Sequence, residues 1–143
     1  MSPVTHLIDT SAVARILTDP AVRKTLNRHL VEGVVGICEV TELEILYSAR
    51  SLADRLDKED LLAELFNWVP VPDGVYRRAR VVQRMLTDRG EHRSAGPVDL
   101  IVAATAELGG LTLLHHDKDF DAIARATGQP VAWVGRPAPT GTP

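Results

Sequence analysis

The feature that most constrains the fold of this chain is the alternation of short apolar runs with longer segments of helical periodicity. The apolar runs are bounded by acidic residues, glycine or proline, which is typical of buried strands. The expected strands are residues 4–8, 34–38, 68–71, 111–115 and 131–134. Strands that alternate with helices predict a parallel sheet covered by helices on both faces, so the expected fold class is α/β.

Helical segments fill the intervals between these strands. They are expected at residues 11–18, 19–31, 40–50, 54–67, 73–89, 97–108 and 119–126. Thr10 or Ser11 is the expected N-cap of the first helix, and Asp73 is the expected N-cap of the fifth. Gly90 is expected to end the fifth helix, because glycine favours the backbone conformation that follows a helix.

Length and composition fit one globular domain. The chain has 143 residues, of which 45% are hydrophobic and 24% are charged. A chain of this length can bury a core without disulfides or a structural metal. We expect a single domain over residues 1–135 and a frayed, flexible tail over residues 136–143, which are rich in proline, glycine and threonine.

Charge and cysteine content exclude several classes of protein. The net charge of -3 excludes a broadly basic surface for nucleic acid, although not a local basic patch. Cys38 is the only cysteine, which excludes a disulfide framework and a cysteine zinc site. No apolar run approaches the roughly 18 residues of a membrane span. The first residues show no secretory signal, so we expect a cytoplasmic protein without membrane contact.

Several acidic residues follow the expected strands or begin the expected helices. Asp9 comes directly after the first strand, and Asp117 follows the fourth. Asp99 lies in the first turn of the helix at 97–108, and Asp119 begins the helix after it. Because ligands of parallel sheets bind beyond the carboxyl ends of the strands, we expect these carboxylates to lie at one rim.

Glu44 adds an acid from the helix that follows the second strand. On a helical wheel its neighbours are Val40 and Tyr47 on one side and Thr41 and Ser48 on the other. This face is mostly apolar or small, so Glu44 is expected to point inward. An inward carboxylate needs a partner, because burying an unpaired charge is costly.

Carboxylates that gather at one rim repel each other and raise one another's pKa. A divalent cation removes this repulsion, and Mg²⁺ and Mn²⁺ prefer hard oxygen ligands. Because such an ion supports phosphodiester hydrolysis, the pattern favours a metal-dependent nuclease. Each acid also has a structural alternative: Asp9 and Asp119 as helix caps, and Asp99 as a carboxylate favoured by the helix dipole.

Three stretches of the sequence resemble PIN-domain ribonucleases. LIDTSAVARIL resembles the opening of that family, TELEILYSAR its second acidic segment, and PVDLIVAATAELGGLTLLHHDKDFDAIA its third and fourth segments. Their order and spacing are similar to those of VapC-type toxins from bacterial toxin–antitoxin pairs, over nearly the whole chain to about Val134. The resemblance implies a three-layer α/β/α PIN-like fold with a central, mostly parallel sheet.

The resemblance also assigns roles to individual residues. The acids that match the family's metal-binding quartet are Asp9, Glu44, Asp99 and Asp117. Ser11 matches a small hydroxyl residue close to the metal, and Asp119 matches an acid that supports the ligands. Glu39 and Glu42 are alternatives to Glu44, and Ser48 stands where the family often has glycine.

The activity implied by the resemblance is that of a Mg²⁺- or Mn²⁺-dependent endoribonuclease leaving 5′-phosphate and 3′-hydroxyl ends. Asp9, Glu44 and Asp99 would hold the catalytic ion, and Asp117 would support it or a second ion. The implied partners are RNA as the substrate, a cognate VapB-type antitoxin as the inhibitor, and a second copy of the chain in a homodimer.

Two further groups of residues have both a functional and a structural interpretation. The candidates for RNA contact are Arg77, Arg80, Arg84 and Arg93. The first three share one helical face, which is alternatively an ordinary solvated face. The pair His115–His116 is interpreted as structural, because neighbouring strand residues point to opposite faces and do not easily bind one ion.

Functions of other classes are weighed against the nuclease. A haloacid-dehalogenase-like phosphatase needs Asp-x-Asp after its first strand, and here Ser11 replaces the second acid. A receiver domain needs a phosphorylatable aspartate at a middle strand's end, which Cys38–Glu39 does not supply. A non-catalytic PIN-like binding module is the remaining alternative, although such a module gains nothing from crowded carboxylates.

Overall fold

The computed structural model describes residues 3–135. Its five strands in this range form one sheet in the order β3-β2-β1-β4-β5, and every neighbouring pair is parallel. The strands are β1 (His6–Ile8), β2 (Val35–Ile37), β3 (Asn67–Trp68), β4 (Thr112–His115) and β5 (Val131–Trp133). The predicted parallel sheet is confirmed, and β1 lies at its centre.

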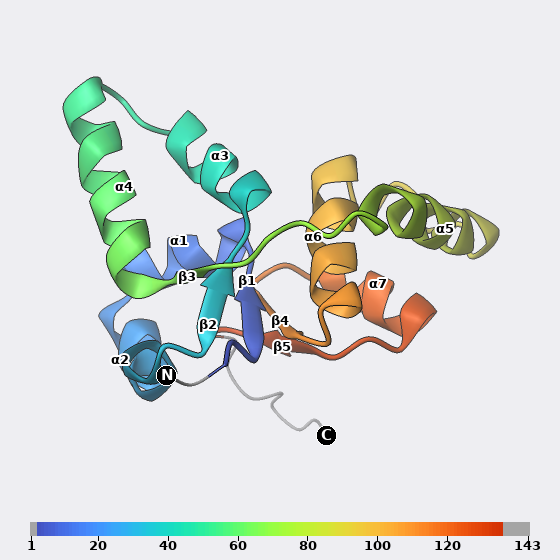
Figure 1. The fold of residues 1–143 in the computed structure, drawn as a ribbon. Helices are drawn as coiled ribbons and strands as arrows, with labels where there is room; N and C mark the ends of the chain where they lie inside the picture. The colour runs from blue at the N-terminus through green and yellow to red at the C-terminus, as the bar shows by residue number, and fades with distance from the viewer. Residues whose placement is uncertain (1–2, 136–143) are drawn as a thin grey trace, which may run out of the picture.

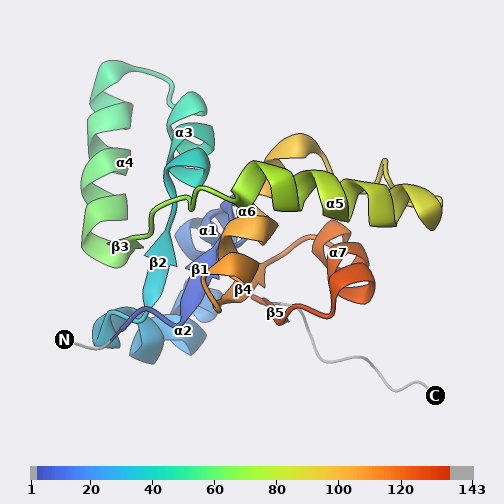
Figure 2. The same ribbon diagram turned by 45° about the vertical axis from the view of Figure 1, so that its right-hand side comes forward.

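Helices on both faces of the sheet complete a three-layer α/β/α fold, as predicted. They are α1 (Thr10–Thr18), α2 (Pro20–Glu32), α3 (Glu39–Tyr47), α4 (Leu52–Leu65), α5 (Val75–Asp88), α6 (Pro97–Leu108) and α7 (Asp119–Thr127). Figures 1 and 2 show α1 to α4 grouped on one side of the sheet and α5 to α7 on the other.

Alternating side chains of the central strands build a separate core on each face. Leu7 and Leu113 belong to the cluster that packs under α5, α6 and α7. Ile8 and Leu114, the next residue of each strand, belong to the cluster under α1 to α4. Because successive strand residues point to opposite faces, one continuous apolar run supplies both cores.

Two helix caps differ from the expectation. The N-cap of α1 is Asp9, which confirms the structural alternative given for this residue and replaces Thr10 or Ser11, because the strand passes into the helix without a loop and Asp9 is the last extended residue. Gly74, rather than Asp73, is the N-cap of α5 and supplies no side-chain hydrogen bond, because a turn precedes this helix.

Two expectations concern the limits of the domain. Within the described range, none of the helices has the length and apolar character needed to cross a membrane. The expected tail over 136–143 lies outside the described residues.

Gly36 in β2 allows the chain after β3 to pass close to the sheet. A Cβ atom at this position would overlap the side chain of Val69 and lie 2.9 Å from a methyl group of Val4. The sheet and its covering segments therefore depend on the absence of a side chain here.

We expect Gly36→Ala to lower the free energy of unfolding by about 1–3 kcal/mol, because the added methyl group overpacks the core. Urea denaturation measures the loss. Gly74→Ala is the matched control, since a Cβ at Gly74 would meet only Leu108 at 3.8 Å. A Gly36→Ala variant as stable as this control would contradict the close packing at β2.

Candidate active site

The carboxyl ends of the central strands meet the starts of several helices at one edge of the sheet. β1 leads into α1 through Asp9, β2 leads into α3, and β4 ends shortly before Asp117. Helices α3 and α6 contact each other, and Figure 1 shows them standing beside the strand ends. This edge, here called the acidic rim, carries Asp9, Glu44, Asp99, Asp117 and Asp119.

Asp9 is the most buried acid of the rim, with only 5% of its surface exposed. Its Oδ1 accepts hydrogen bonds from the Ala12 N–H at 3.1 Å and from the Ser11 hydroxyl at 2.8 Å. Burial nevertheless raises the pKa of Asp9 to about 6, and the negative charge of Asp99 adds to the rise. Asp9 is thus a buried carboxyl within the electrostatic reach of Asp99.

Asp99, in the first turn of α6, links the other acids electrostatically. Its Oδ2 accepts a hydrogen bond from the Gly96 N–H at 3.4 Å, which supports the start of the helix. Burial raises the pKa of Asp99 to about 6, and the charges of Asp117, Glu44 and Asp119 raise it further. Acids from α3 and from the segment after β4 therefore act on the same carboxyl group.

Glu44 lies at the rim, but it is exposed, so the expectation that it points into the core is wrong. Helix α3 instead buries Thr41 and Ile45. Tyr47, a neighbour of Glu44 on the wheel, is 92% exposed, which shows that this apolar face is an open surface. The Oε1 atom of Glu44 accepts a hydrogen bond from the Thr10 hydroxyl at 2.6 Å, which orients the carboxylate.

The alternative acids of α3 have other surroundings. Glu39 accepts a hydrogen bond from Nε1 of Trp68 at 3.3 Å. Glu42 lines a pocket between α3 and α4 together with Glu39 and Leu62. Among the acids of this helix, Glu44 is the one whose charge helps to raise the pKa of Asp99, so it lies within electrostatic reach of that carboxyl group.

Two hydroxyl side chains fix the acids of the rim. The Ser11 hydroxyl donates to Asp9 and accepts a hydrogen bond from the His116 N–H at 2.8 Å, which ties α1 to the end of β4. The Thr10 hydroxyl holds Glu44. The sequence predicted Thr10 only as a helix cap. Its position directly after Asp9 was the one feature of the sequence that pointed to a place at the rim.

The segment after β4 places the remaining two acids. Oδ1 of Asp117 accepts a hydrogen bond from the Asp119 N–H at 2.9 Å. The Asp117 N–H donates to Nδ1 of His115 at 3.2 Å. Burial and the charge of Asp117 raise the pKa of Asp119. These contacts hold the Asp117 carboxylate in place, with Asp119 beside it.

The histidine pair has structural contacts. The His115 ring is fully buried, 4.9 Å from the ring of Trp133, and its Nε2 lies 3.6 Å from Oδ1 of Asp121. Nδ1 of His116 donates to the Val134 carbonyl at 2.6 Å. These contacts agree with the structural interpretation of both residues.

The donor set of the rim fits a hard divalent cation. Within residues 3–135, no lysine or arginine forms an ion pair with Asp9, Glu44, Asp99 or Asp117. Within the same range, no group of three or more His, Cys, Asp or Glu side chains could by itself hold a metal ion. Mg²⁺ is usually held by one or two carboxylates plus water and phosphate, so Asp9, which forms no ion pair, and the neighbouring acids suit such an ion.

The arginine candidates lie on α5, which packs against α6, and on the segment after α5. Arg77, Arg80 and Arg84 are exposed on α5, and Arg93 is exposed in the connection to α6. Arg78, on the same helix, is turned toward α6. The predicted common face of the first three residues is therefore solvent-facing.

Comparison with known proteins identifies the class to which this fold and rim belong. The model of the PIN domain matches residues 6–126, which is most of the chain. The chain therefore belongs to the PIN-domain family.

Close relatives narrow this assignment to the VapC ribonucleases. Ribonuclease VapC21 of Mycobacterium tuberculosis is 42% identical over 132 residues, covering 92% of this chain and 95% of the relative. Ribonuclease VapC2 of the same species is 46% identical over 125 residues, covering 86% and 87% of the two chains.

Solved structures show the same fold. A DNA-bound VapBC structure from Salmonella typhimurium matches with a TM-score of 0.74 at 20% identity, covering 91% of this chain and 98% of the other. VapBC2 from Rickettsia felis, bound to a promoter fragment, matches with a TM-score of 0.76 at 13% identity and the same coverage of 91% and 98%.

We expect Asp9→Asn to stabilise the metal-free protein at neutral pH. Burial raises the pKa of Asp9 from 3.8, its value in the unfolded chain, to about 6 in the folded protein. Protonated Asp9 therefore stabilises the folded state fully below pH 3.8, and this contribution to stability is lost as the pH rises through about 6. Asparagine keeps the cap without the charge, so the free energy of unfolding in EDTA should rise by on the order of 1–3 kcal/mol at about pH 7.5, and little below about pH 4.

Urea denaturation at the two pH values measures this difference. Asp60→Asn serves as the control, because Asp60 is exposed on α4 and its replacement should have little effect at either pH. Equal stability of Asp9→Asn and the parent protein at neutral pH would contradict the burial of a charged Asp9.

Proposed function

We propose that this chain is a metal-dependent endoribonuclease toxin of a VapBC-type pair. The observation that carries the proposal is the acidic rim, where Asp9 and Asp99 have raised pKa values and Glu44 and Asp117 act on Asp99. The relationship to ribonuclease VapC21, at 42% identity over 132 residues, supports RNA as the substrate.

Asp9, Glu44 and Asp99 would hold Mg²⁺ or Mn²⁺, and Asp117 would support that ion or a second one. When bound, the ion would lower the pKa of water and stabilise charge on the leaving oxygen. Ser11 and Thr10 keep Asp9 and Glu44 in place through their hydroxyl groups. Asp119, bonded through its N–H to Asp117, limits the movement of that carboxylate.

The proposed reaction is hydrolysis of an RNA phosphodiester. The oxygen of water forms a bond to phosphorus, and the bond from phosphorus to the 3′ oxygen breaks. The proton lost by water is balanced by the proton that the 3′ oxygen takes up. The products are a 5′-phosphate and a 3′-hydroxyl.

The alternative functions are less well supported. A haloacid-dehalogenase-like phosphatase requires a free acid two residues after the nucleophile, but Ser11 occupies that position and is bonded to Asp9. In a non-catalytic binding module, the burial of Asp9 and the repulsion around Asp99 would lower the stability of the fold and serve no function.

We also propose that a cognate VapB-type antitoxin inhibits the enzyme by covering the rim. The solved VapBC structures with this fold support such a partner. On this chain, a groove of about 390 Å³ lies between α1, α3 and α4 and includes Thr10, Val13, Leu17, Glu44 and Ile45. A segment bound in this groove would contact Glu44 directly and bring a cationic side chain close to the carboxylates.

A homodimer is the third element of the proposal. Leu43 is 66% exposed and Tyr47 is 92% exposed. With Val40, Glu44 and Val98 they line a groove of about 320 Å³ between α3 and α6. Because exposed apolar patches mark association sites, equilibrium sedimentation of the purified chain tests this element directly.

We expect purified protein to cut total RNA with Mg²⁺ or Mn²⁺ and not with EDTA. Asp99→Asn and Asp9→Asn should each lower the rate by roughly 100-fold or more, because each removes a carboxylate that holds the ion. Glu64→Gln is the matched control, since Glu64 is exposed on α4 away from the rim. Mapping the cut ends identifies the products. Full activity of Asp99→Asn would contradict the proposal that Asp99 holds the catalytic ion.

We expect Mn²⁺ to raise the melting temperature of the protein more at about pH 7.5 than at about pH 5, because protonated carboxyls bind the ion poorly. Burial raises the pKa values of Asp9 and Asp99 to about 6, so both are largely protonated at the lower pH. Differential scanning fluorimetry measures the shift. A shift that survives unchanged in Asp99→Asn would place the ion elsewhere.

A further inference from the structure

Three arginines of α5 have no acidic partner among the residues that the structure describes. Arg77, Arg80 and Arg84 are exposed and take part in none of its ion pairs. Arg78, in contrast, forms a two-pronged contact with Glu107 of α6, at 2.6 and 2.9 Å. This face of α5, which also carries Asp88, therefore has a local excess of positive charge, although the chain as a whole has a net charge of -3.

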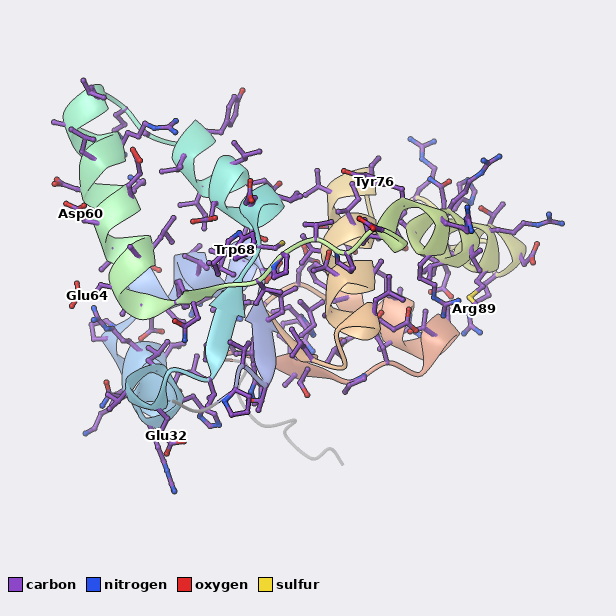
Figure 3. All side chains as sticks on the ribbon, in the orientation of Figure 1. Glu32, Asp60, Glu64, Trp68, Tyr76 and Arg89 are labelled. Carbon is purple, nitrogen blue, oxygen red and sulfur yellow. The ribbon has the colours of Figure 1, made fainter. Side chains whose placement is uncertain are left out.

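The three arginines form a line along the helix. Residues three, four and seven apart share one face, and seven residues of helix extend about 10 Å. A line of this length can contact successive phosphates of one nucleic-acid strand. Figure 3 shows nitrogen-tipped side chains along the outer side of α5, between the labelled Tyr76 and Arg89.

This arginine face is joined to the acidic rim through α6. A groove of about 190 Å³ between the two helices is lined by Tyr76, Ala79, Arg80, Gln83, Pro97, Leu100 and Ile101. Pro97 begins α6, and Asp99 lies in the same first turn. On the wheel, Asp99 is about 160° from both Pro97 and Ile101, so the acid and the groove lie on opposite sides of one helical turn.

We infer that the arginine face of α5 binds the phosphates of a single RNA strand that runs from the acidic rim across the first turn of α6. This inference rests on the proposed nuclease function. Arginine pairs with phosphate through two parallel hydrogen bonds, and none of the three guanidinium groups is held in an ion pair, although Asp88 lines a pocket with Arg80 and Arg84. An exposed line of charge separated from the acidic rim by one turn of α6 suits a flexible strand that bends around this turn.

The test compares two variants with the same loss of charge. R77Q/R80Q/R84Q removes the arginine face, and R23Q/K24Q/R28Q removes three exposed cations from α2, which Figure 1 shows at the opposite end of the molecule. Both are made in the Asp99→Asn background with EDTA present, so that the labelled probe, a single-stranded poly(U) oligonucleotide, is not cut. The affinity for the probe is measured over a series of salt concentrations.

We expect the slope of log K against log salt to become shallower by about 2 in the α5 variant, since each phosphate contact on a single strand contributes roughly 0.7. The α2 variant should keep the parent slope. Equal slopes in all three proteins would overturn the inference and leave the arginine face to a partner other than RNA. A similar loss in both variants would also overturn it, because net charge alone would then explain the effect.

Cleavage by the two variants with Asp99 restored separates this inference from the proposed function. The α5 variant should show a KM for RNA raised by about tenfold or more, with kcat and the Mn²⁺-induced rise in melting temperature unchanged. If the parent protein cuts no RNA with any metal, the proposed function fails, while the salt series still decides whether α5 binds the strand.

Discussion

The buried carboxylate of Asp9 is the constraint on which the rim depends. It follows β1 directly, caps α1 through the Ala12 N–H and accepts a hydrogen bond from Ser11, which in turn binds the backbone after β4. One side chain therefore fixes the start of a helix relative to two central strands. The same burial that makes this position rigid raises the pKa of Asp9 to about 6, so the folded chain carries a carboxyl that is costly to ionise.

The acids around Asp9 increase this cost rather than reduce it. Asp99 is reached by the charges of Glu44, Asp117 and Asp119, and no cation of the described chain pairs with it. Folding alone would favour neutral residues at these positions. Crowded carboxylates at the carboxyl edge of a parallel sheet are instead expected where activity is retained at the expense of stability. A bound cation or a covering partner with a cationic side chain would relieve the same repulsion.

The surfaces around the rim differ in chemistry and so suit different partners. The α3 face with Leu43 and Tyr47 is apolar and open. The groove between α1, α3 and α4 reaches Glu44. On the other side of α6, α5 carries the unpaired Arg80 and its neighbours. The two grooves meet at Glu44, whereas the arginine face of α5 lies across α6 from Asp99.

Much of the architecture follows from the sequence by itself. The apolar runs predicted the strands, although each strand is shorter than its run, and β3 begins one residue before the predicted 68–71 and ends at Trp68. Periodicity predicted the helices to within a few residues. The order of strand and acid predicted that Asp9 and Asp117 lie at the same edge, because parallel strands end together.

Only the tertiary structure decided what surrounds each residue. The helical wheel ranks the faces of α3 by polarity, but it does not show which face another element covers, so it placed Glu44 in the core when Thr41 and Ile45 are buried instead. The bond from Thr10 to Glu44 and the bond from Ser11 to the end of β4 join residues 34 and 105 positions apart. Such contacts are set by how strands and helices pack, and no local pattern in the sequence encodes them.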